Sequence, residues 1–222
     1  MFERCLILVF IFMLLNSCGI NGLAREQIKN ENSILKEPIY IEAYKLYYEK
    51  KYLQAYNIIY EYIFNKKGSS LILHSLIVYC ASKLNNIDEL FKSYQKIEEQ
   101  KYYLFARGVL LIIEERRKDE CIDLFKEILK FFPENPIVQM YLGYLYIVNN
   151  KPYLAQDILN KSTENLSNYP FNKYFLAMAN YFANNKEKAL ENINDSIKLF
   201  PSFMKEEIES AEKFKKKLLD NQ

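Results

Sequence analysis

Few residues of this 222-residue chain are grouped as acid–base, metal or nucleophilic chemistry would require. His74 is the single histidine, and it lacks the cysteine pair or H-E-x-x-H spacing that would hold zinc. The five glycines are dispersed, so they form no phosphate-binding loop. Glu114-Glu115 and Glu206-Glu207 are adjacent pairs that we expect to be solvated rather than poised for proton transfer. The sequence therefore predicts a protein that is not an enzyme and uses no metal or cofactor.

Cys18 is the cysteine whose neighbours suggest a chemical role. An apolar run over residues 5–15 follows Arg4 and is too short to span a bilayer, which takes about 20 helical residues. It leads directly into L-N-S-C at residues 15–18. This sequence resembles the lipobox of bacterial lipoproteins, in which a cysteine after a small residue is lipidated and becomes the new N-terminus. The resemblance implies a signal peptide over residues 1–17 and a lipid on Cys18. An ordinary signal peptide with an incidental cysteine, or an uncleaved apolar anchor, would be the alternative.

Tyrosine is frequent, with 19 residues in the chain, and tryptophan is absent. A tyrosine ring offers a large apolar face with a hydroxyl at its tip, a combination enriched at protein interfaces. Whether these rings bind a partner or fill a core depends on the elements that carry them.

Those elements are set by an internal repeat. Cys121, Ala155 and Ala189 follow one another at intervals of 34 residues. Small residues recur at positions 8 and 20 of this frame and large apolar residues at position 24, a pattern that resembles the tetratricopeptide repeat (TPR), a helix-turn-helix unit. The resemblance implies an all-α fold, a TPR-like α-solenoid of about five helix pairs. The pairs are predicted over residues 36–70, 71–101, 102–135, 136–169 and 170–203.

Small residues matter in this frame because two helices approach to about 8–10 Å only where their facing positions are small. We therefore expect Gly143 to face Ala155 across one such pair. Asn-Asn pairs at residues 85–86, 149–150 and 184–185 are predicted to form the turns within three of the pairs.

The segments that flank the repeats have different roles. Residues 204–222 are predicted to form a capping helix, because a solenoid needs a terminal helix with a polar outer side. Its apolar positions fall on one helical face, at Met204, Ile208, Ala211, Phe214 and Leu218. Residues 18–35 are mostly polar and lack periodicity, so we expect the lipidated cysteine to be followed by a flexible tether.

Ligands of TPR proteins usually lie in the concave groove lined by the first helix of each pair. The resemblance assigns to this groove Tyr40, Tyr44, Tyr48, Tyr79, Leu110, Tyr144, Tyr174 and Met178. Such a groove would be aromatic and would suit a protein or peptide partner. The alternative is that many of these tyrosines pack between helices in the core.

The net charge of +2 leaves no basic surface that would argue for nucleic acid, and we expect no small-molecule substrate. Together with the lipobox, the repeats predict a lipid-anchored scaffold or adaptor of the bacterial cell envelope. It would face the periplasm and bind a protein or peptide. An alternative function is outer-membrane protein assembly, since the architecture resembles the five-TPR barrel-assembly lipoprotein. Fold alone does not separate these two functions.

Overall fold

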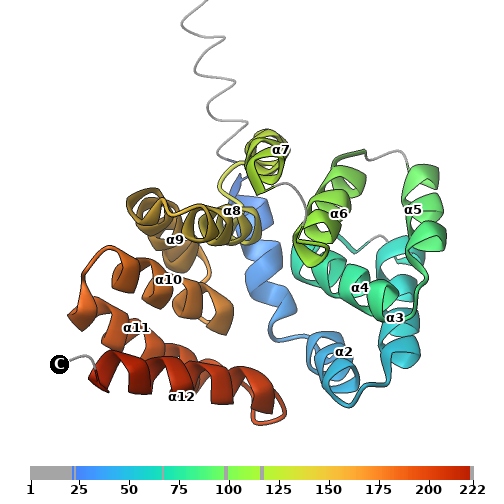
Figure 1. The fold of residues 1–222 in the computed structure, drawn as a ribbon. Helices are drawn as coiled ribbons and strands as arrows, with labels where there is room; N and C mark the ends of the chain where they lie inside the picture. Colours follow the sequence, from blue (N-terminus) through green and yellow to red (C-terminus); the bar gives the residue numbers. More distant parts are fainter. Residues whose placement is uncertain (1–21, 23, 67, 98–99, 116–117, 221–222) are drawn as a thin grey trace, which may run out of the picture.

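The computed structural model of the chain describes residues 22, 24–66, 68–97, 100–115 and 118–220 (Figure 1). The predicted signal peptide and Cys18 lie outside these residues. The described part consists of helices and turns and contains no strand. The all-α fold predicted from the sequence is confirmed.

Five helix pairs follow one another along the described residues, and their bounds agree with a TPR-like solenoid. They are α2 (Pro38–Tyr48) with α3 (Tyr52–Tyr60), α4 (Leu71–Lys83) with α5 (Ile87–Lys96), α6 (Gln100–Ile113) with α7 (Lys118–Phe131), α8 (Pro136–Val148) with α9 (Pro152–Asn165), and α10 (Pro170–Phe182) with α11 (Lys186–Leu199). Helix α3 continues into one π turn, η1 (Glu61–Asn65). Helix α12 (Lys205–Asp220) packs against α11 as the predicted cap.

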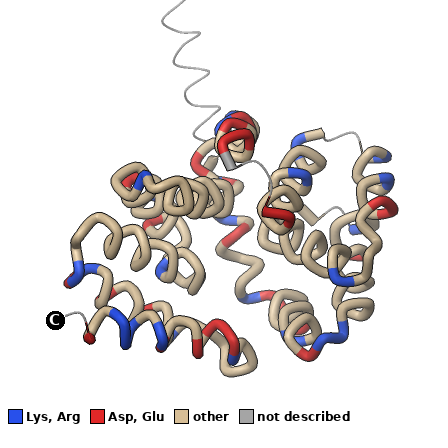
Figure 2. Tube along the Cα trace, in the orientation of Figure 1, with Lys and Arg blue, Asp and Glu red and all other residues tan. Residues whose placement is uncertain are grey.

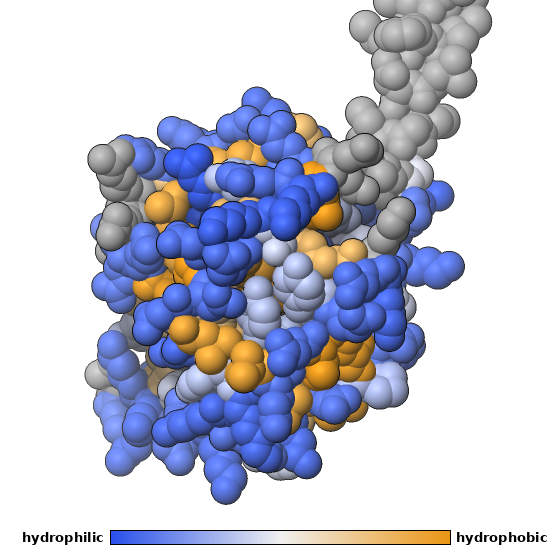
Figure 3. Space-filling view, turned by 90° about the vertical axis from the view of Figure 1, so that its right-hand side faces the viewer, coloured by the Kyte–Doolittle hydropathy of each residue, from blue (hydrophilic) through white to orange (hydrophobic). Residues whose placement is uncertain are grey.

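In four of the five pairs the first helix has fewer charged residues than the second. The first pair is the exception, because α3 has no charged residue and α2 has Glu42 and Lys45. Helix α8 has no charged residue, and α4 and α10 have one lysine each. Helix α11, by contrast, has charged residues throughout its length. Charged positions are therefore more frequent on the second helix of these four pairs, and they follow one another closely along α12 (Figure 2). The face that presents α3 and α5 is mostly hydrophilic, with separate hydrophobic patches (Figure 3).

The turn within each pair is closed by one residue with left-handed backbone, namely Lys50, Asn85, Glu115, Asn150 and Asn184. After four of these residues, the next backbone N–H donates to a carbonyl five positions earlier, as Asn86 does to Ala81 and Lys151 does to Tyr146. This pairing satisfies a carbonyl at the helix end. Asparagine adopts left-handed backbone more readily than most residues. The Asn-Asn turns predicted from the sequence are confirmed.

The left-handed turn residues also show that the position predicted to face the groove is off by one residue in α6. Tyr44, Tyr79, Tyr144 and Met178 each precede the left-handed residue of their turn by six positions. In the third pair that position holds Val109, which is fully buried, and not Leu110. The turn between α6 and α7 is one residue longer than the others, so a frame counted from Cys121 misplaces α6 by one residue.

Gly108 and Gly143 allow the first helix of a pair to approach the second closely. A Cβ atom on Gly143 would lie 2.4 Å from the Leu159 side chain, and one on Gly108 would lie 2.8 Å from Phe125. The predicted neighbour of Gly143 was Ala155. The nearest side chain is instead Leu159, one helical turn further along α9, and its size requires the glycine.

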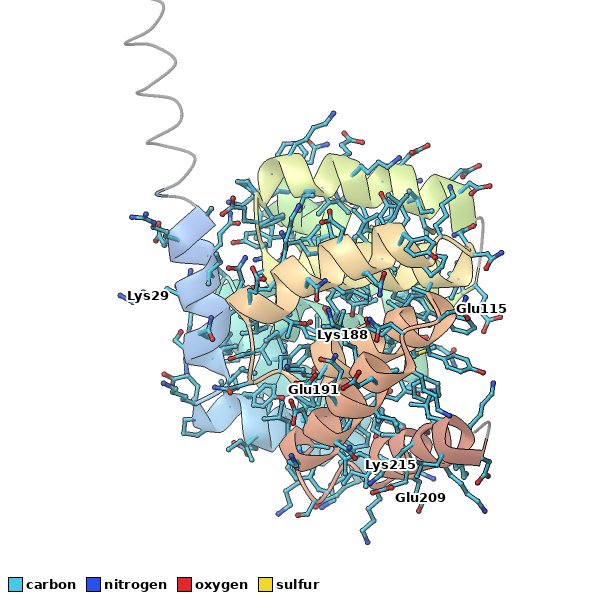
Figure 4. The ribbon with its side chains drawn as sticks, turned by 90° about the vertical axis from the view of Figure 1, so that its left-hand side faces the viewer. Lys29, Glu115, Lys188, Glu191, Glu209 and Lys215 are labelled. Carbon is cyan, nitrogen blue, oxygen red and sulfur yellow. The ribbon has the colours of Figure 1, made fainter. Side chains whose placement is uncertain are left out.

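Residues 24–34 form a helix, which corrects the flexible tether predicted for residues 18–35. Ala24 and Ile34 are 1% and 2% exposed, so this N-terminal helix (residues 24–34) belongs to the core. It lies along one edge of the molecule, with Lys29 pointing away from the repeats (Figure 4). Its polar residues suggested a coil, but several of them form hydrogen bonds with distant parts of the chain. Asn32, for example, donates to the carbonyl of Asn165, the last residue of α9, at 2.8 Å.

Glu31 is the centre of this contact and is 1% exposed. Its carboxylate accepts hydrogen bonds from the Leu71 N–H at 2.7 Å and the Ser70 hydroxyl at 2.9 Å, at the start of α4. The Asn135 amide donates to it at 3.4 Å, and Asn135 also caps α8 by accepting from the Ile137 N–H. One carboxyl group therefore joins the N-termini of two inner helices. Burial raises the pKa of Glu31 to about 7, against the lowering effect of these donors.

The solenoid is wound tightly enough for its two ends to meet. Helices α4 and α8, which are not sequential neighbours, contact each other. The hydroxyls of Tyr44 in α2 and Tyr169 before α10 lie 3.1 Å apart. The ring of Tyr48 lies 6.2 Å from that of Phe203, two residues before the beginning of the capping helix. Figure 1 shows α2 and the beginning of α12 near one another. The concave side is therefore partly closed by the chain's own ends.

Candidate partner-binding site

A cavity of about 200 Å³ remains on the concave side, where these ends meet. Its walls come from α2, α4, α8, the beginning of α10 and α12. Six tyrosines line it, and we call it the tyrosine cavity: Tyr44, Tyr47, Tyr48, Tyr79, Tyr141 and Tyr169. Glu207 of α12 is the one charged residue among the described residues that line it.

The tyrosine cavity brings together three of the eight residues predicted to bind a partner, namely Tyr44, Tyr48 and Tyr79. Tyr40 lies beneath them, 5% exposed, with its ring 4.8 Å from that of Tyr44. Tyr44 is itself 6% exposed. Tyr40 is therefore a core residue, as the alternative interpretation of the sequence expected, and most of Tyr44 also packs in the core.

The other four predicted residues are spread over the inner helices. Tyr174 lines a neighbouring cavity of about 180 Å³. Tyr144 lines a third cavity of about 140 Å³ beside α6, with its ring 5.2 Å from Phe175. Leu110 and Met178 are half-buried and line none of these three cavities. The continuous groove expected from TPR geometry is divided because the inner helices touch across the superhelix.

Sequence reasoning missed the contribution of Glu207, which it grouped with Glu206 as solvated. Glu206 is exposed, whereas Glu207 is half-buried and faces the cavity. A signal was present in the period of α12: Glu207 follows Met204 by three positions and precedes Ala211 by four, and both of these are fully buried. That spacing places all three on the inner face of the helix.

The carboxylate of Glu207 lies among aromatic rings. Its Oε2 atom is buried and has no hydrogen-bond partner. Burial raises the pKa of Glu207, and a hydrogen bond from Tyr48 lowers it. Burial also raises the pKa of Tyr44 and Tyr48 well above the usual range, so these hydroxyls stay neutral at physiological pH. The cavity thus offers apolar ring faces, neutral hydroxyls and one carboxylate.

The remaining titratable groups of interest have structural roles. His74 Nδ1 lies 2.7 Å from the Tyr94 hydroxyl, and its ring stacks on Tyr102. Burial lowers the pKa of His74 to about 3, so the ring is neutral. The side chains of Cys80 and Cys121 are buried. In the described ranges, three or more His, Cys, Asp or Glu residues nowhere group as a metal site would require. Nor does any described helix combine the length and apolarity needed to cross a bilayer.

Comparison with solved structures identifies the architecture. TTC0263, a thermophilic TPR protein of Thermus thermophilus, matches with a TM-score of 0.53 over 78% of this chain and 96% of its own, at 13% identity. The chain has the TPR fold. The Sgt2 TPR domain from Aspergillus fumigatus is also similar, with a TM-score of 0.45, 18% identity and coverage of 52% of this chain and 78% of that one. YrrB, described as a TPR protein with an unusual peptide-binding site, has a TM-score of 0.44, 14% identity and coverage of 79% and 90%.

Sequence comparison gives a more distant likeness. No family model matches the chain. The septation ring formation regulator EzrA of Listeria monocytogenes serotype 4a (strain HCC23) is 25% identical over 144 residues, which is 62% of this chain. The chain spans 25% of the length of that relative.

Proposed function

We propose that this chain is a non-catalytic scaffold that binds a protein or peptide partner on its concave side. A lipid on Cys18 would hold it to a membrane of the bacterial cell envelope, facing the periplasm. The tyrosine cavity is the observation that supports partner binding. The half-buried rings of Tyr47, Tyr48 and Tyr79 present apolar faces and hydroxyls together, as residues at protein interfaces commonly do.

The docked N-terminal helix adds a geometric consequence to the lipid anchor. Five residues separate Cys18 from Ala24, the first buried residue of that helix. Even fully extended, this length spans about 20 Å. A lipid on Cys18 would therefore keep the edge of the solenoid close to the membrane surface, in place of the long tether expected from the sequence.

The anchor is tested by metabolic labelling with palmitate. Cys18→Ala should abolish labelling and move the protein from the membrane fraction to a soluble or unprocessed pool. Cys5→Ala is the matched control, because the proposed signal peptide that contains it is removed. Unchanged labelling of the Cys18 variant would refute lipidation at this residue.

The binding site is tested by photo-crosslinking in intact cells. A benzoylphenylalanine at Tyr48, in the tyrosine cavity, should capture a specific partner. The same group at Tyr153, which is 70% exposed on α9, should not capture that partner. Equal capture from both positions, or capture from Tyr153 alone, would place the binding surface elsewhere. Capture of an outer-membrane barrel protein would assign the chain to the alternative function in barrel assembly.

A further inference from the structure

Glu207 stands at the junction of two cavities. The tyrosine cavity and the neighbouring cavity of about 180 Å³ share Phe171, Phe175 and Glu207 among their lining residues. Glu207 therefore forms part of the walls of both cavities, together with these two aromatic rings.

No cation compensates this carboxylate in the described part of the chain. The residues that line the two cavities include no lysine, arginine or histidine. The buried Oε2 atom of Glu207 accepts no hydrogen bond. A charge or polar atom removed from water without a partner costs free energy. A ligand that brings a positive charge and an N–H donor would remove this cost.

The size of the tyrosine cavity limits what can enter it. Its volume of about 200 Å³ is below the roughly 300–1,000 Å³ typical of sites for whole small-molecule ligands. One long side chain of a partner fits this space better than a cofactor does. The surrounding rings suit a group whose charge is spread over a flat surface, because such a group can stack on aromatic faces.

We propose that the tyrosine cavity receives an arginine side chain of the partner, with the guanidinium donating to Glu207 and stacking on the tyrosine rings. This inference rests on the proposed function and names the feature of the partner that the site recognises. Arginine fits better than lysine because its planar guanidinium is more weakly hydrated, stacks on rings and can donate two parallel hydrogen bonds to one carboxylate.

Small probes test the site without knowledge of the partner. Nα-acetyl-arginine methylamide, its neutral isostere Nα-acetyl-citrulline methylamide and the corresponding lysine derivative are titrated into the full chain with labelled tyrosine rings, followed by NMR. On the wild-type protein we expect the arginine probe to bind about tenfold more tightly than the citrulline probe, with lysine between them. Glu207→Gln should make the arginine and citrulline affinities nearly equal. Glu206→Gln, at the exposed neighbour, should leave the preference intact.

Glu207→Asp separates loss of charge from loss of fold, since it keeps the carboxylate and should retain part of the arginine preference. Equal affinity of the arginine and citrulline probes for the wild type, or absence of a saturable shift with the arginine probe, would overturn the inference. Tighter binding of lysine than arginine would overturn the assignment to arginine. If crosslinking from Tyr48 captures a partner while the probes show no preference, this inference fails and the proposed function stands. If the probes show the arginine preference while crosslinking from Tyr48 captures no partner, the arginine site stands and the scaffold function is rejected.

Discussion

Glu31 and Glu207 are both turned inward, and their surroundings give them different roles. Glu31 accepts hydrogen bonds from the beginning of α4 and from the cap of α8, so its carboxyl group is fully engaged inside the protein. Glu207 keeps a buried oxygen without a partner beside a cavity. A satisfied buried carboxyl group stabilises a fold, whereas an unsatisfied one beside open space is suited to a ligand.

The pKa of Glu31 predicts how stability depends on pH. Its pKa is about 7 in the folded state against 4.5 for an ordinary glutamate, so the folded state binds the proton more tightly. The contribution to stability is complete below pH 4.5 and is lost as the pH rises through 7. Glu31→Gln mimics the protonated form and does not ionise. Its free energy of unfolding relative to the wild type should therefore rise between pH 4.5 and 7.5, by up to about 3 kcal/mol.

Urea denaturation at several pH values measures this difference. His74 has the opposite dependence, because its folded pKa of about 3 makes stability fall as the pH drops below 6.5. Both proteins contain His74, so its effect cancels in the comparison. Glu26→Gln, on the exposed face of the same helix, is the matched control. A constant difference between Glu31→Gln and wild type across this range would contradict the prediction.

At the scale of elements, the sequence predicts what local packing determines. Small residues at a 34-residue spacing and Asn-Asn turns locate the helix pairs, because both features reflect contacts within one repeat. The N-terminal helix was missed because its buried residues are few and it is held by contacts far away in the chain, such as that with Asn165 at the end of α9. The shifted register of α6 was missed because one extra turn residue near Glu115 leaves no mark in composition.

Ile34→Ala tests whether the N-terminal helix is part of the fold. Ile34 is 2% exposed, and truncating a buried isoleucine leaves a cavity, so the free energy of unfolding should fall by about 2–4 kcal/mol. Lys36→Ala, at an exposed position two residues on, should change it by less than about 0.5 kcal/mol. Chemical denaturation measures both variants. Equal stability of the two would mean that residues 24–34 behave as the tether predicted from the sequence.

The shape of the whole molecule depends on curvature summed over all repeats, and no single motif encodes it. The contacts that close the solenoid join residues far apart in sequence, as Tyr44 with Tyr169 and Tyr48 with Phe203 show. For this reason the sequence predicted which helices form the concave side but not that their tyrosines divide into separate cavities. Glu207 lines a cavity only because the solenoid closes in this way. The walls of that cavity include residues of α2, near one end of the described chain, and of α12, at the other.

Closure also changes how the repeats share stability. In an open solenoid each repeat contacts its neighbours, so a mutation in the last element affects the adjacent helices and leaves the first repeat unchanged. Here the ring of Phe203 lies 6.2 Å from Tyr48, within the range of favourable aromatic pairs. Phe203→Ala should therefore increase amide hydrogen exchange in α2 as well as in α11 and α12. Phe182→Ala, at a residue 48% exposed at the end of α10, is the control and should leave α2 protected. Exchange that increases near Phe203 but stays unchanged throughout α2 would show that the two ends do not support each other in solution.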